Sequence, residues 1–124
     1  MRNLVIIESP YGGDIDRNTK YARACVKDCV ERGESCFASH LFFTQEGILD
    51  ENNKEERELG IELGYDIMER ADIVAIYHNL GFSAGMLKAI TRASQLNKPI
   101  EFRILQNWPS LTATNIKQEY GSNP

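Results

Sequence analysis

The sequence predicts an α/β fold in which a mostly parallel β-sheet is flanked by helices. Two segments, residues 4–7 and 73–77, are continuously apolar, which is typical of strands buried on both faces of a parallel sheet. Longer segments between such runs repeat apolar residues at helical spacing. Strands that alternate with helices in this way form βαβ units, whose crossover connections are right-handed.

Local capping and breaking signals place the boundaries of the elements. Asp14 or Asp16 can cap the start of the first helix, and Gly33 can end it. Residues 40–50 are expected to be irregular, and the polar segment 51–58 leads into the second helix. In chain order we expect a strand at 4–7, a helix at 14–32, a strand at 35–39, a helix running to about 70, a strand at 73–77, a helix at 83–96 and a strand at 100–104.

The length of 124 residues fits one domain with a core of ordinary size. We assign residues 1–105 to this α/β domain and residues 106–124 to its C-terminal extension, where the pattern supports one short helix at most. No apolar run approaches the roughly 20 residues that a membrane span needs. The first apolar run stops at Glu8 and is too short and too acidic for a signal peptide, so we expect a cytoplasmic protein.

The composition argues against several kinds of partner. The net charge is −4 and the pI is about 5.2, whereas a nucleic-acid polymer favours a basic face. Cys25, Cys29 and Cys36 form no C-x-x-C pair and are interpreted as small core residues. The two histidines are far apart in the chain and have no cysteine cluster beside them, so we expect neither a metal nor a cofactor.

In parallel sheets, ligands bind outside the carboxyl ends of the strands, which selects the loops after the first three strands. The first loop contains Gly12 and Gly13, which let the backbone turn sharply and approach a ligand. It carries neither a dinucleotide fingerprint nor a P-loop, and the plain alternative is a strand-to-helix turn. The candidate ligand contacts in this loop and the helical turn after it are Glu8, Ser9, Pro10, Tyr11, Gly13, Asp14, Arg17 and Asn18.

Several of these residues have two readings. A carboxylate at the end of a buried strand needs a partner, so Glu8 either orients a sugar hydroxyl or caps nearby backbone donors. Tyr11 could stack on a base or simply pack against the protein. Arg17 and Asn18 could reach a phosphate or a sugar hydroxyl, or they could belong to a solvated surface.

The second and third loops supply further candidates. His40 follows the second strand and is either a ligand contact or a structural histidine. Ser83 lies at or near the start of a helix, where free N–H groups and the helix dipole can hold an anion or a sugar. The candidate ligand contacts from these loops are His40, Asn79, Ser83, Gly85 and Met86.

Three features together resemble the nucleoside 2-deoxyribosyltransferase-like superfamily, and a branch of it found in bacteria and phages. They are the run Ser-Pro-Tyr-x-Gly-Asp-x-x-Arg-Asn from residue 9, His40 after the second strand, and Ser83-x-Gly85-Met86 at the start of the third helix. The resemblance covers roughly residues 3–103. It implies a Rossmann-like sheet of about five strands, a homo-oligomer, and a pocket for a nucleoside or nucleotide.

Enzymes of that superfamily cleave an N-glycosidic bond with a glutamate nucleophile on the helix after the third strand, assisted by an acidic residue on the preceding helix. Counted from Ser83-x-Gly85-Met86, the nucleophile position falls on Ala89. The assisting position falls near Gly64, with Glu62 and Asp66 as acidic neighbours. The resemblance therefore implies a pocket that lacks its catalytic glutamate.

Three functions follow from this reading. The first is a nucleotide- or nucleoside-binding protein without turnover, which in a phage could sequester a signalling nucleotide. The second is an N-glycosidase or deoxyribosyltransferase with a relocated carboxylate, for which Glu8 and Asp66 are the candidates. The third is a protein-interaction module. Apolar residues in 41–49 and around Trp108 could form a subunit contact, or Phe42, Phe43 and Trp108 could complete the core.

Overall fold

A computed structural model describes residues 1–108 of the chain, and within them four parallel strands form one sheet in the order β2-β1-β3-β4. The α/β class and the parallel sheet are confirmed, with four strands in the described residues where about five were expected. The register pairs Val5 with Cys36 on one side of β1 and with Ile73 on the other. The strands are β1 (Leu4–Glu8), β2 (Ser35–Phe37), β3 (Ile73–Tyr77) and β4 (Ile100–Arg103).

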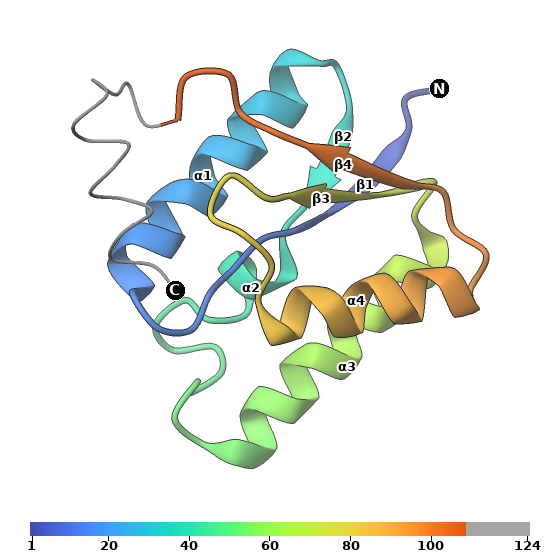
Figure 1. Cartoon of the computed structure of the whole chain (residues 1–124). Helices are drawn as coiled ribbons and strands as arrows, with labels where there is room; N and C mark the ends of the chain where they lie inside the picture. Colours follow the sequence, from blue (N-terminus) through green and yellow to red (C-terminus); the bar gives the residue numbers. More distant parts are fainter. Residues whose placement is uncertain (109–124) are drawn as a thin grey trace.

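Helices cover both faces of this sheet, so the molecule has three layers (Figure 1). On one face, α1 (Ile15–Glu31) packs Tyr21, Cys25 and Cys29 against Val5, Ile7, Ala75 and Tyr77. On the other face, Met68 of α3 (Lys54–Arg70) and Met86, Ala89 and Ala93 of α4 (Ala84–Gln95) pack against Ile6, Val74 and Ile76. The alternation of β1 and β3 side chains between these two clusters explains why both strands are continuously apolar.

The observed helix ends follow from side-chain caps. Asp14 rather than Asp16 caps α1, because its carboxylate accepts the backbone N–H of Arg17. Asn53 caps α3 by accepting the N–H of Glu56, so this helix begins within the segment we expected to lead into it. The strand expected at 35–39 ends at Phe37.

A short helix, α2 (Ser39–Phe42), replaces part of the irregular stretch expected at 40–50. It has no side-chain cap, and it packs against α3. Neighbouring structure therefore supports this helix, and no local sequence signal marks its start. The short helix expected within 106–124 falls largely outside the described residues.

The described residues also test the expected core. Cys25 and Cys29 are fully buried and Cys36 is partly buried, and all three are free thiols, as predicted. Trp108 packs on Tyr21 with 5.2 Å between ring centroids, which favours the core interpretation over a subunit contact. Phe42 is 45% exposed and belongs to neither of the two buried core clusters of the described residues. No helix within residues 1–108 is long and apolar enough to cross a membrane.

A buried polar network ties β4 to α1 on the side of the sheet away from α3 and α4. Arg103, with 3% of its side chain exposed, makes two hydrogen bonds of 2.8 and 2.7 Å to the carboxylate of Glu34. It also donates to the Tyr77 hydroxyl, which in turn donates to Asp28 at 2.6 Å. The guanidinium beside Glu34 holds the pKa of that carboxyl below its usual range. The hydrogen bonds of this network hold β4, α1 and the turn after α1 together.

Candidate functional site

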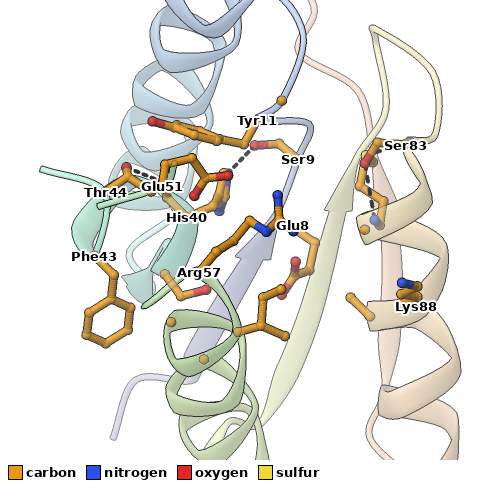
Figure 2. Close-up of a pocket in the computed structure, with 18 of the residues that line it drawn as sticks. Glu8, Ser9, Tyr11, His40, Phe43, Thr44, Glu51, Arg57, Ser83 and Lys88 are labelled. Atoms are coloured by element: carbon orange, nitrogen blue, oxygen red, sulfur yellow. Dashed lines mark hydrogen bonds between the residues drawn. The ribbon is translucent and has the colours of Figure 1, made fainter. Parts of the chain in front are cut away.

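A pocket of about 450 Å³ lies at the carboxyl ends of β1 and β3, where the sequence predicted a site. The loop after β1, the helix α2, one face of α3 and the first turns of α4 form its walls (Figure 2). Its volume lies within the range of small-molecule sites. Of the expected contacts, the pocket lining includes Glu8, Ser9, Tyr11, His40, Ser83, Gly85 and Met86.

The remaining expected contacts shape the site from outside its lining. Asn18 is 1% exposed, and its amide donates to the carbonyl oxygens of Tyr11 and Gly12. Asp14 caps α1, and Gly13 has a φ of +90°, a conformation that favours glycine. None of these three residues lines the pocket, and their groups hold the loop in the conformation that presents Tyr11 to it.

Four further candidate residues also lie outside the pocket lining. Asn79 accepts the N–H of Leu105 and donates to the carbonyl of that residue, so it fixes the chain after β4. Arg17 donates to Asn18. Pro10 is buried and, like Arg17 and Asn79, does not line the pocket. Asp66 is exposed on α3 and is also absent from the lining.

Ser9 and His40 form a hydrogen-bonded pair on one wall. The Ser9 Oγ lies 2.6 Å from the His40 Nε2, and the dashed line in Figure 2 marks this contact. The other ring nitrogen, Nδ1, is buried and has no hydrogen-bond partner within the described part of the chain. Burial lowers the pKa of His40 to about 4, because desolvation disfavours the charged ring. The imidazole is therefore neutral at physiological pH.

Glu8 ends β1 and points into the pocket between α3 and α4 (Figure 2). Within residues 1–108 its carboxyl group has no hydrogen bond or ion pair. Burial raises the pKa of Glu8 to about 8. At neutral pH this carboxyl is mostly protonated, so it can both donate and accept a hydrogen bond.

The first turn of α4 forms the opposite wall. The Ser83 hydroxyl accepts the N–H of Met86 at 3.2 Å and thereby caps the helix. Gly85 is exposed, so the backbone of the first turn is open to the pocket. Ala89 also lines the pocket and is 2% exposed. None of the twelve residues of α4 is acidic.

One wall of the pocket comes from α3, which the predicted site did not include. A Cβ at Gly64 would lie 2.7 Å from the Ser39 Oγ, so this glycine lets α3 approach α2 closely. Gly60 and Gly64 share one helical face because they are four residues apart, and this spacing was the available signal. The lining residues that the sequence did not predict as contacts are Gly12, Ser39, Phe43, Thr44, Leu49, Glu51, Glu56, Arg57, Gly60, Ile61, Gly64, Tyr65, Ala84, Lys88 and Ala89.

No group of three or more potential metal ligands occurs in residues 1–108. The polar groups deepest in the site are the neutral Glu8 carboxyl, the neutral His40 ring and the Ser9 hydroxyl. Such groups suit an uncharged ligand portion with hydrogen-bond donors and acceptors. Two cations, Arg57 and Lys88, lie on the α3 and α4 walls and are exposed (Figure 2). Two acidic side chains, Glu51 and Glu56, also line the pocket and are half-buried.

The chain belongs to the family described as a domain of unknown function, DUF7768, whose model matches residues 3–103. Among solved structures it is similar to a 2-deoxyribosyltransferase from the psychrotolerant bacterium Bacillus psychrosaccharolyticus, with a TM-score of 0.66 and 14% sequence identity. That alignment covers 94% of this chain and 81% of the other. At this identity the likeness shows the Rossmann-like fold alone. No curated protein sequence matches the chain.

Proposed function

We propose that the pocket binds a nucleoside or a derivative of one, in the cytoplasm and without turnover. The observation that carries the proposal is Glu8, whose carboxyl group has no hydrogen-bond or ion-pair partner among residues 1–108 and points into a pocket of about 450 Å³. A carboxyl that is half-buried and lacks a protein partner destabilises the folded protein, which supports a ligand that supplies the missing hydrogen bonds. The fold shared with a 2-deoxyribosyltransferase supports a nucleoside as that ligand.

The lining fits the parts of a nucleoside. Tyr11 offers a ring face on which a base can stack, and aromatic stacking is tolerant of base identity. The Glu8 carboxyl and the Ser9 hydroxyl offer neutral donors and acceptors for sugar hydroxyls or base edges. Sequestration of a signalling nucleotide, as a phage protein could perform, and assembly as a homo-oligomer are compatible with such a site.

The absence of turnover rests on the chemistry of α4 and Glu8. Covalent capture of a sugar needs an ionised carboxylate beside the oxocarbenium-like transition state. α4 has no acidic residue, and Ala89 stands where the resemblance expects the nucleophile. Glu8 is mostly protonated at neutral pH, which makes it a poor nucleophile.

Binding is tested with Tyr11 variants. We expect some of the common ribo- and deoxynucleosides and their phosphates to raise the Tm of the wild-type protein, because a ligand specific for the folded state stabilises it. Tyr11→Ala is expected to lose roughly 1–3 kcal/mol of binding free energy, the usual value of a stacked base, and Tyr11→Phe should keep it. Phe102→Ala, a control on exposed β4, should bind like the wild type.

If no nucleoside or nucleotide shifts the Tm, the binding proposal is wrong and the protein-interaction module becomes the better reading. Equal affinities of the wild type and Tyr11→Ala would instead place the ligand away from Tyr11.

An N-glycosidase or deoxyribosyltransferase is the second candidate, and the protonated state of Glu8 favours it. A carboxyl with a pKa of about 8 can act as a general acid that protonates the departing base at neutral pH. This candidate predicts free base from deoxynucleosides, measured by liquid chromatography, and a loss of at least a hundredfold in Glu8→Gln. Asp66→Asn is the matched control, since Asp66 lies outside the pocket. Recovery of intact nucleosides from the wild-type protein would exclude it.

A further inference from the structure

A shallow groove on the outer side of α3 and α4 adjoins the pocket, and two cations line it. Its lining consists of Tyr65, Leu87, Lys88, Thr91, Arg92 and Gln95. Tyr65 and Lys88 also line the main pocket, so the two depressions share a wall. No carboxylate belongs to the groove lining, although the chain carries a net charge of −4.

The two cations are close together and poorly neutralised. Lys88 and Arg92 are four residues apart on α4, a spacing that places like charges side by side and destabilises a helix. Lys88 is exposed and has no ion pair within residues 1–108. Arg92 approaches Glu69 at 3.6 Å, and both side chains are at least 40% exposed, which makes this a weak pair.

The Arg92 guanidinium also stacks on an aromatic ring, which helps to hold it in place. It lies over the Tyr65 ring, 5.8 Å from the centroid, and its buried Nε has no hydrogen-bond partner among the described residues. Guanidinium and ammonium groups are the side chains that bind phosphate oxygens best. An anion between Lys88 and Arg92 would relieve their repulsion and could bond to the exposed part of the guanidinium, whose side chain is 40% exposed.

We propose that this groove binds the phosphate group of the ligand whose nucleoside portion fills the main pocket. The inference rests on the proposed function and deepens it, since it makes the preferred ligand a nucleoside phosphate and not a nucleoside. The ligand passes from one depression to the other over Tyr65 and Lys88, which line both.

The test compares each nucleoside with its 5′-monophosphate and 5′-triphosphate by calorimetric titration at low ionic strength. We expect the phosphorylated forms to bind the wild-type protein roughly tenfold more tightly, and the difference to shrink as salt is raised. Lys88→Gln and Arg92→Gln should each remove most of that difference. Arg92 lines the groove but not the main pocket, so Arg92→Gln should change the affinity for the unphosphorylated nucleoside little. Arg92→Lys should retain it, because the charge remains.

Lys27→Gln is the matched control for Lys88→Gln, because Lys27 is equally exposed but lies on α1, on the opposite face of the sheet. It removes the same charge and should leave the preference for phosphate intact. A preference for phosphate that survives in both Lys88→Gln and Arg92→Gln would overturn the groove assignment. Nucleosides that bind as tightly as their phosphates would overturn it too, yet leave the proposed function standing. If neither class binds, both proposals fail.

Discussion

Glu8→Gln is expected to stabilise the protein by roughly 1–3 kcal/mol at neutral pH. The folded state holds the Glu8 proton up to a pKa of about 8, whereas the unfolded chain releases it near 4.5. The folded state therefore binds more protons in this window, so the wild-type protein loses stability as the pH rises from about 4.5 to about 8. Glutamine has nearly the same shape and does not ionise, so the variant escapes this loss.

Above pH 6.5, the pH dependence of the free energy of unfolding reports the effect of Glu8 without that of His40. His40 has its pKa lowered from 6.5 to about 4, so its effect on stability has the opposite sign and is confined to that lower range. Between pH 6.5 and 8, urea unfolding should show a falling free energy of unfolding for the wild type and a flatter profile for Glu8→Gln. Glu62→Gln, on the exposed face of α3, should follow the wild type. A variant that is less stable than the wild type at pH 8 would contradict the unpartnered state of Glu8.

Arg103→Met is expected to destabilise the protein by about 3–5 kcal/mol. The substitution keeps the volume of the aliphatic stem but leaves the Glu34 carboxylate, 14% exposed, without its two short hydrogen bonds. It also removes a donor from the Tyr77 hydroxyl. The free energy of unfolding in urea measures the loss, and Arg23→Met, at an exposed site on α1, should change it by less than about 0.5 kcal/mol.

A double variant separates charge from packing in this network. Because most of the expected loss comes from a stranded carboxylate, Glu34→Gln should recover part of the stability of Arg103→Met. A loss below about 1 kcal/mol in Arg103→Met, or no recovery in the double variant, would contradict the role given to this network.

Much of the fold could be predicted because the pattern of apolar residues in a strand depends on which of its faces are buried. The strand expected at 73–77 is β3 as observed, since a run buried on both faces cannot alternate polar and apolar residues. Helix ends were placed to within a few residues because Asp14 and Ser83 cap them through local hydrogen bonds. By contrast, α2 has no such cap and depends on its packing against α3, so no local pattern marked it.

The location of the pocket could be predicted from the sequence, but the contacts between its residues could not. The rule for parallel sheets selected loops that contribute to the pocket lining, because it depends only on the direction of the strands. It could not reveal that His40 meets Ser9 across 31 positions of sequence, or that Gly64 brings α3 against Ser39. Nor could the sequence reveal that the Asn18 amide is buried and donates to the loop.

Glu8 also links the stability of the protein to the proposed binding of a ligand. A group that destabilises the empty protein and points into a pocket is typical of sites where function and stability conflict. Glu8→Gln should therefore be more stable and bind its ligand less well, since glutamine replaces the carboxyl proton with an amide. Improved stability together with unchanged affinity would place the ligand elsewhere in the pocket.

The most direct test of the central claim is to purify the protein under native conditions, denature it, and identify the small molecule that it releases by mass spectrometry. We expect the wild-type protein to release an intact molecule that contains a nucleoside, and we expect Tyr11→Ala, which lacks the stacking ring, to release much less of it. Release of a free base would show turnover, and release of a molecule without a nucleoside would contradict the account.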